Sequence, residues 1–438
     1  MTIGRLFLVL SIVLLAFFGK AQIIEDVIAR LQSFNYFFAP LLILYLVSVL
    51  ERTLDKFGFI HWIEDYLETR NLNRLSYAAI PGLIGLIPSV GGAHFACSIF
   101  PVSARKKLSG CRLAAINYFF RHFHVYSNPL IAGTVLACSI TNTSLWFLAL
   151  NLFPLSVLTF ISGWYFLIPK RDENEEVRNV ARIKFSPKTI CLLVLITIET
   201  LVFFFLDYKI YLWLIIVNLT LIISSPAKVL FALIPTKDNI FLFSEVAFIL
   251  IFASVVNSLG ISQILTDFIC NSGTPLWLAF SLITILLAYI TGISQAYVAI
   301  IMPLVSVISG EESILVCWLL ALGFYVQYLT PSHLCLVVCA DFFKCSVLNL
   351  IKQIFPAVTM AFLFWLFLFI SVYSYFFIFF SNFILTSYIL SVIMSTTNKE
   401  LNKFLKNYRK RGTDHRKPNL NFKTILSIGG TVQSTFKI

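Results

Sequence analysis

Charged residues are scarce in this sequence, and acids are scarcer than bases. Only 12% of the 438 residues are charged, with 33 Lys and Arg against 21 Asp and Glu, whereas 59% of the residues are apolar and Phe alone occurs 44 times. A soluble domain carries about 25% charged residues. The apolar runs are long and continuous, without the alternation of ~10-residue transmembrane β-strands. We therefore expect an all-α polytopic membrane protein.

Motifs for nucleotide binding and for common hydrolytic enzymes are missing as well. The sequence contains no Walker motif, no Rossmann fingerprint, no H-E-x-x-H and no G-x-S-x-G. Because a nucleotide site is lacking, a pump that hydrolyses ATP is disfavoured. We predict a protein that is not an enzyme, has no catalytic residues and uses no cofactor.

The cysteines show no pattern of a disulfide framework. There are nine of them, irregularly spaced and mostly inside apolar runs, where Cys behaves as a small hydrophobic residue. Cys335, Cys339 and Cys345 follow His333, yet the spacing C-x3-C-x5-C is no established zinc motif. We expect neither a disulfide framework nor a metal site.

The net charge of +12 lies mostly at the C-terminal end. Residues 399–438 hold ten Lys or Arg against two acids and so contribute +8. A basic tail after the last membrane span is typical of a topology determinant that touches anionic lipid, and a solvated disordered tail fits the same composition. The expected partner is therefore the lipid bilayer and not nucleic acid.

Stretches without charge delimit the expected spans, and basic loops set their orientation. With ~20 residues per span, we expect ten spans: 3–19, 34–50, 113–139, 143–168, 189–206, 210–225, 239–258, 313–340 and two within 353–398. Residues 170–188 form a basic cytoplasmic linker between an N-terminal membrane repeat, 1–169, and a C-terminal membrane repeat, 189–398, which ends in an extra helix. Both chain termini are expected in the cytoplasm.

Two of the charge-free runs, 75–104 and 268–310, contain Pro and Gly at positions unsuited to a simple spanning helix. Broken backbone at membrane depth occurs only where it is buried in protein or lines a wet cavity. Re-entrant hairpins of this type build substrate or ion sites in transporters. Because the first run has basic flanks and the second has acidic flanks, we expect the two hairpins to enter from opposite sides, as in an inverted-topology repeat.

A weak similarity between the halves supports the repeat. An offset of 203 residues places Ala96 on Ala299. After each hairpin follows a segment interrupted by proline, at 120–130 and at 325–335. The opposite charge of the hairpin flanks is the stronger of the two arguments.

Polar and small residues mark both expected hairpin tips. The candidate substrate- or ion-binding residues there are Ser89, Gly91, Gly92 and His94 in the first tip and Ser294 and Gln295 in the second. Free amides and hydroxyls at such tips can bind a carboxylate or a cation. The alternative is that the small residues only allow close helix packing.

The remaining candidates lie in the two proline-interrupted segments. They are Asn117, Arg121, His122 and Asn128 in the first half and Thr330, Ser332 and His333 in the second. An Arg at membrane depth is costly and should face a cavity or a partner, and its permanent charge suits an anion. The alternative is that Arg121 and the nearby histidines snorkel to the cytoplasmic interface near Arg112.

Four segments resemble blocks of a known family: GLIPSVGGAHFACSIFPVSA, AAINYFFRHFHVYSNPLIAGTVLA, GISQAYVAIIMPLV and LTPSHLCLVVCADFF. The resemblance is to domain-of-unknown-function family 401, a prokaryotic membrane family grouped with the ion-transporter superfamily of gluconate, citrate and dicarboxylate carriers. It implies an inverted repeat with two hairpins in a prokaryotic inner membrane. It implies no particular substrate.

These observations together predict a secondary transporter for a small anionic solute such as an organic acid, coupled to H⁺ or Na⁺. Its partners are the solute and the coupling cation, and assembly as a homodimer is left open. The first alternative is a membrane-embedded metal-binding protein or enzyme that uses His122, His124, His333 and the cysteines. The second alternative is a passive channel, which saturable and gradient-dependent uptake would exclude.

Overall fold

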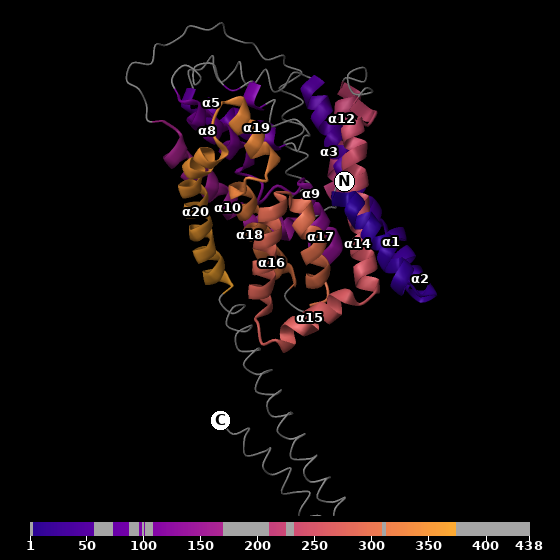
Figure 1. Cartoon of the computed structure of the whole chain (residues 1–438). Coiled ribbons are helices and arrows are strands. Elements are labelled where there is room, and N and C mark those ends of the chain that lie inside the picture. The colour runs from indigo at the N-terminus through magenta and orange to yellow at the C-terminus, as the bar shows by residue number, and fades with distance from the viewer. Residues whose placement is uncertain are drawn as a thin grey trace, which may run out of the picture. The chain divides into compact units, whose positions relative to one another are not determined.

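The computed structural model describes residues 3–56, 73–86, 96–98, 100, 108–169, 210–224, 232–308 and 312–373 (Figure 1). All secondary structure within these ranges is helical, which confirms the all-α fold class. Several expectations fall outside the described residues, namely the first hairpin tip, the linker at 170–188, the span at 189–206, the extra terminal helix and the basic tail.

The described part of the first half contains seven α-helices and one π-helix. They are α1 (Ile3–Phe18), α2 (Ala21–Gln32), the π-helix η1 (Phe34–Phe38), α3 (Ala39–Lys56), α5 (Asn73–Leu86), α8 (Gly110–His122), α9 (Ala132–Thr141) and α10 (Leu145–Leu167). The second half contributes α12 (Ile210–Ser224), α14 (Lys237–Ser258), α15 (Ile261–Asn271), α16 (Leu276–Thr291), α17 (Ser294–Val305), α18 (Glu312–Leu329), α19 (Leu334–Phe342) and α20 (Val347–Val372).

Five helical stretches of the described part are long and apolar enough to cross a membrane. They are Phe34–Thr53, Leu145–Leu167, Asn239–Ser258, Ser313–Phe342 and Val347–Val372. A globular protein of ordinary composition has no reason to carry so many apolar helical stretches of this length with so few charged residues. These stretches therefore support the prediction of a helical membrane protein, whereas the ten spans and the two re-entrant hairpins remain predictions.

The expected crossing at 113–139 is broken in the structure. Helix α8 ends at His122 and helix α9 begins only at Ala132. Between them the Asn128 side-chain oxygen accepts a hydrogen bond from the Leu130 backbone N–H at 3.0 Å, which is the local turn that Asn favours over helix. The crossing at 313–340 is broken in the same way between Leu329 and Leu334.

The charge rule misplaces the start of the last described helix. The sequence predicts a span after Lys352, but α20 begins at Val347, where the Ser346 side chain caps it by accepting from the Asn349 N–H. Lys352 is therefore an exposed residue of the second helical turn. A long cationic side chain can lie inside a helix near its end and extend its charge toward water.

The two halves share one helix pattern. Shifting α5 and α10 by the offset of 203 residues gives 276–289 and 348–370, and helices α16 and α20 occupy Leu276–Thr291 and Val347–Val372. The same shift relates the interrupted pair α8 and α9 to the interrupted pair α18 and α19. The correspondence of helix bounds supports the two-repeat organisation far better than the sparse sequence identity does.

The interrupted helices pack across the two halves. Helix α8 contacts α19 and α20, and helix α9 contacts α17 and α18 (Figure 1). Within each half the contact of α5 with α8 is matched by that of α16 with α18. Gly85 allows the α5–α8 contact, because a Cβ at this position would collide with the Arg121 carbonyl oxygen. Gly85 is therefore a small residue that allows close packing of two helices.

Two tyrosines join the interrupted helices by reciprocal hydrogen bonds. The Tyr118 hydroxyl on α8 donates to the Tyr328 carbonyl oxygen on α18 at 3.1 Å. The Tyr328 hydroxyl donates back to the Phe119 carbonyl oxygen at 3.0 Å. The last carbonyls of a helix have no partner within the helix, so each helix end satisfies carbonyl groups of the other.

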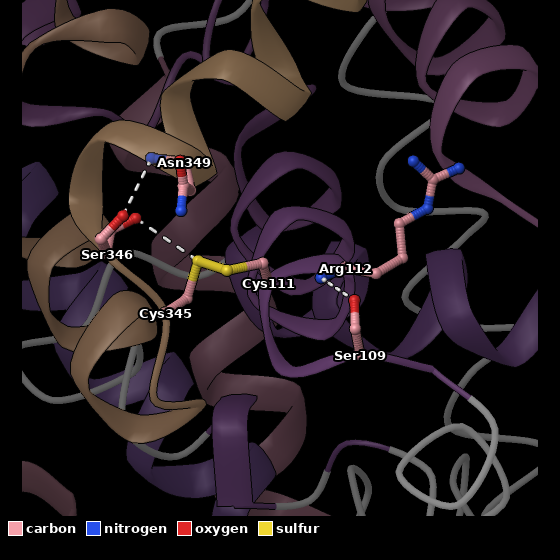
Figure 2. Close-up of a disulfide and its surroundings, with 6 residues drawn as sticks. All are labelled: Ser109, Cys111, Arg112, Cys345, Ser346 and Asn349. Carbon is pink, nitrogen blue, oxygen red and sulfur yellow. Dashed lines mark hydrogen bonds between the residues drawn. A yellow bond between two sulfur atoms is a disulfide. The ribbon is translucent and has the colours of Figure 1, made fainter.

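A disulfide between Cys111 and Cys345 contradicts the expectation from the cysteine pattern (Figure 2). Cys111 lies at the start of α8, and Cys345 lies in the loop before α20. The two residues are separated by 234 positions in the sequence, so no local spacing could reveal the pair. The disulfide lies at the end of the molecule that basic residues predict to be cytoplasmic, where structural disulfides are rare.

We predict that Tyr118→Phe and Tyr328→Phe each lower stability, because each removes a hydrogen bond to a buried carbonyl group. The expected loss is roughly 0.6–1.7 kcal/mol per substitution, as for other hydrogen bonds between membrane helices. Unfolding in detergent micelles measures it. Tyr165→Phe is the matched control, since that side chain is 78% exposed. Equal stability of all three variants would show that the reciprocal bonds contribute nothing.

We also predict that the disulfide holds the two halves together covalently. After proteolysis within residues 170–188, the protein should run as one band on a non-reducing gel and as two bands after reduction. Cys111→Ser should give two bands under both conditions, and the Cys317→Ser control should behave as the wild type, because Cys317 is a free buried cysteine. Two bands from the wild type without reductant, with thiols blocked before lysis, would contradict the bond.

Candidate functional site

The candidate site lies where the two interrupted helices meet. It is formed by the C-terminal end of α8, the N-terminal end of α19 and the turn between α16 and α17. These three elements come from both halves of the chain. The site therefore exists only when the halves are assembled.

Two histidines face each other at this junction. The Nε2 atoms of His122 and His333 are 3.5 Å apart. The other ring nitrogen of each histidine lies on a carbonyl oxygen: Nδ1 of His122 is 2.7 Å from the Tyr118 carbonyl, and Nδ1 of His333 is 2.8 Å from the Gly292 carbonyl. Because a carbonyl oxygen can only accept, both Nδ1 atoms carry hydrogen and both rings are fixed in orientation.

Arg121 and Cys335 complete the cluster. The Arg121 side chain is only 5% exposed, and its Nη1 lies 3.2 Å from the Cys335 sulfur. The Nε atom of Arg121 has no hydrogen-bond partner among the described residues. The Arg121 side chain is thus enclosed by other parts of the protein.

The turn between α16 and α17 is fixed by the break between α18 and α19. The Thr330 and Ser332 hydroxyls donate to the Tyr289 carbonyl oxygen at 2.6 and 3.1 Å. Gly292 has a φ of +62° and lies against Ser332, where a Cβ would approach the Ser332 carbonyl carbon to 2.6 Å. Thr330 and Ser332 therefore act as caps for the carbonyl end of α16.

Ser294 and Gln295 lie at the start of α17. Ser294 is buried, and its hydroxyl donates to the Gln295 side-chain oxygen at 3.3 Å. Ser294 packs against Gly133 of α9, where a Cβ would come within 2.6 Å of the serine Cβ. The contact with Gly133 joins the start of α17 to α9.

Asn117 lies deeper in the protein than the histidines. Its amide group donates to the Ala96 carbonyl oxygen at 2.8 Å, and its side-chain oxygen is 3.7 Å from the sulfurs of both Cys97 and Cys339. The residue is fully buried. It joins segment 96–98 to α8 and α19 and has no direct contact with the histidine pair.

The structure therefore divides the predicted site residues into three groups. Arg121, His122 and His333 come together at one point. The residues held in packing or capping contacts are Asn117, Asn128, Ser294, Gln295, Thr330 and Ser332. The residues outside the described part are Ser89, Gly91, Gly92 and His94.

The sequence does not place Cys335 among the candidate binding residues. It indicates Cys335 only through the cysteine spacing and as one of the cysteines of the metal-binding alternative, whereas in the structure its sulfur lies close to His122, His333 and Arg121. The signal that could have found it is the short His333-x-Cys335 spacing directly after a helix-breaking proline. Gln327 also lies at the site, with its amide nitrogen 3.2 Å from Nδ1 of His333.

Glu245, an acidic residue inside the apolar stretch Asn239–Ser258, has a structural role. Its carboxylate accepts a hydrogen bond from the Gly4 backbone N–H at 2.6 Å. Gly4 is the second residue of helix α1, whose first amides have no partner within the helix. An acidic group there also stabilises the positive end of the helix dipole. Helix α1 packs along α14 through this contact.

A cavity of about 610 Å³ lies at the other end of α9. Its polar lining includes Ser33, Tyr36, Ser139, Asn142 and Thr143, and the π-helix η1 forms part of its wall. Helix α9 also contributes Val135, Cys138 and Ile140 to the lining. None of these residues was among the sequence candidates.

Comparison with known proteins places the chain in a family but gives no activity. No curated protein matches the sequence. The sequence profile that does match extends over residues 1–371 and therefore includes every residue of the cluster at Arg121, His122, His333 and Cys335. The chain belongs to the family described as protein of unknown function (DUF401).

Proposed function

We propose that the protein is a secondary transporter for a small anionic solute, such as an organic acid, driven by H⁺ or Na⁺. It resides in the prokaryotic inner membrane and shares the inverted-repeat architecture of the ion-transporter superfamily. The observation that carries this proposal is the buried guanidinium of Arg121 at the junction of the two repeats.

A buried guanidinium with unused donors favours the binding of an anion. Arg is permanently charged, and it is costly in a low-dielectric interior unless it is paired. The described contacts supply Arg121 with the Cys335 sulfur alone, and its Nε donor is left unpaired. A carboxylate would satisfy these donors through charge-assisted hydrogen bonds.

The start of α19 adds a second attraction for an anion. The helix begins at Leu334 beside the cluster, and no side chain caps its N-terminus. The first amides of a helix have no partner within it and carry the positive end of the dipole. In many secondary transporters, the N-terminal end of a half-helix after such an interruption points at the anionic group of the substrate.

The repeated helix pattern supplies a route for alternating access. The two interrupted pairs, α8–α9 and α18–α19, provide matching halves that can rock against each other around a fixed site. Completing this arrangement requires ten spans and two hairpins, with the first hairpin entering from the cytoplasm and the second from outside. The acidic and basic flanks of the hairpins support that orientation.

Arg121→Gln is expected to reduce uptake of an anionic solute at least 100-fold in proteoliposomes, because the substitution removes the charge and the fork of donors. Arg121→Lys keeps the charge without the planar geometry and should retain intermediate activity. A panel of labelled organic acids, with and without a Na⁺ or H⁺ gradient, provides the measurement.

Lys352→Gln is the matched control for loss of one positive charge, since Lys352 is exposed on α20. It should transport as the wild type does. Wild-type uptake kinetics in Arg121→Gln, at normal expression, would contradict the role of Arg121. Absence of any saturable uptake by the wild-type protein across the panel would contradict the transporter proposal itself.

The proposed topology predicts which positions an impermeant thiol reagent can reach in intact cells. In a cysteine-free background, Ser272→Cys in the exposed loop between α15 and α16 should be labelled from outside. Glu175→Cys and Leu420→Cys should be protected, because the linker and the tail carry an excess of Lys and Arg. External labelling of position 175 or 420 would overturn the orientation.

A further inference from the structure

We propose that His122, His333 and Cys335 form a binding site for a transition-metal ion, of which Zn²⁺ is the best fit. This site goes beyond the transport proposal, since it requires neither an anionic solute nor an ion gradient. The inference rests on the mutual placement of three side chains and on the groups that orient them.

The three possible ligand atoms are close enough to share one ion. One nitrogen of each histidine and the sulfur of Cys335 all lie within 4.8 Å of one another. Tetrahedral zinc with nitrogen ligands at ~2.05 Å places two such atoms about 3.3 Å apart. The two Nε2 atoms are separated by 3.5 Å, so the imidazole pair already has nearly the required spacing.

The hydrogen bonds at the far sides of the rings determine which nitrogens face the site. Both Nδ1 atoms donate to backbone carbonyls, of Tyr118 and Gly292. In a neutral imidazole the other nitrogen is then a lone-pair acceptor. Two lone pairs that face each other at 3.5 Å need a positive group between them, either a proton or a metal ion.

The same contacts are those that typically support metal-binding histidines. Such histidines almost always donate their other N–H to a carbonyl or carboxylate group, which fixes the ring and strengthens the ligand. The side-chain amide of Gln327 also lies beside His333. Its nitrogen is 3.2 Å from the His333 Nδ1, and its oxygen has no hydrogen-bond partner among the described residues. If the amide is flipped by 180°, its oxygen can accept a hydrogen bond from the His333 Nδ1–H.

Arg121 favours the sulfur form that binds metal. A cysteine binds metal as the thiolate, and the Arg121 guanidinium lies 3.2 Å from the Cys335 sulfur. The positive charge of Arg121 also repels a metal cation. The single negative charge of the Cys335 thiolate cannot neutralise both Arg121 and a divalent ion. The fourth position of the ion is therefore expected to take an anionic ligand or hydroxide, as open zinc sites do.

The donor set selects the class of ion. Imidazole and thiolate suit zinc and copper, whereas calcium and magnesium require oxygen ligands. Two aromatic rings enclose the pair, because the Tyr118 ring centroid is 4.6 Å from that of His122 and the Tyr328 centroid is 5.9 Å from it. This enclosure limits the number of waters that could hydrate a hard cation.

The test is the metal content and metal affinity of the full-length protein in detergent. Protein purified without chelator should contain close to one equivalent of zinc. After removal of the ion, titration with Zn²⁺ should show one site, and Co²⁺ in its place should give the near-ultraviolet absorption of a cobalt–thiolate bond. That absorption should vanish in Cys335→Ser, which keeps both histidines.

His122→Ala, His333→Ala and Cys335→Ser should each weaken Zn²⁺ binding at least tenfold, a loss that even indirect partners of a metal can produce. The matched controls are His124→Gln and Cys317→Ala, which change a histidine and a cysteine outside the cluster. Both controls should bind as the wild type does. Circular dichroism and thermal unfolding identify any variant that fails to fold.

Zinc content and uptake measured on the same wild-type preparation separate this inference from the transport proposal, because Arg121 lies against the Cys335 sulfur and its substitution would affect both sites. If the protein contains stoichiometric zinc but shows no uptake, the metal site is supported and the transport proposal is contradicted. The metal site is overturned by wild-type protein that binds no Zn²⁺, by affinity unchanged in all three ligand variants, or by a Co²⁺ complex without the thiolate band. A proton shared between the two histidines would then explain their spacing.

Discussion

Backbone carbonyl groups at broken helix ends need hydrogen-bond donors, and this requirement organises the centre of the protein. In a membrane interior no bulk water can supply them. Two of the donors come from the opposite half of the chain: the Tyr328 hydroxyl donates to the Phe119 carbonyl oxygen, and the Tyr118 hydroxyl donates to the Tyr328 carbonyl oxygen. A third bond lies within the second half, where the Thr330 hydroxyl donates to the Tyr289 carbonyl oxygen. The C-terminal ends of α8 and α18 are therefore each stabilised by the opposite half, which makes the two halves mutually dependent.

The candidate site follows from the same requirement. His333 donates one ring N–H to the Gly292 carbonyl at the turn after α16, and the other ring nitrogen is thereby directed at His122. His122 does the same within its own helix by donating to the Tyr118 carbonyl. The groups that repair broken backbone are thus the groups that set the geometry of the cluster, so a substitution at one of them should change stability and binding together.

The sequence predicts the parts of this protein that depend on local composition. Charge-free windows locate α3, α10 and α14 well, and proline with neighbouring polar residues locates the interruptions near Asn128 and Thr330. Arg121, His122 and His333 are also predicted, because polar residues at membrane depth stand out. The bond between Cys111 and Cys345 and the capping role of Thr330 are not predictable, since both depend on residues brought together only by tertiary packing.

The disulfide between Cys111 and Cys345 has a mechanical consequence. It joins the first turn of α8 to the residue just before the cap of α20, so these two points cannot move apart. If the halves rotate against each other, the covalent bond becomes the pivot, and displacement must grow with distance from it. Reduction would release that pivot and enlarge the set of motions open to both halves, so the amplitude of opening would depend on the thiol chemistry of the surrounding compartment.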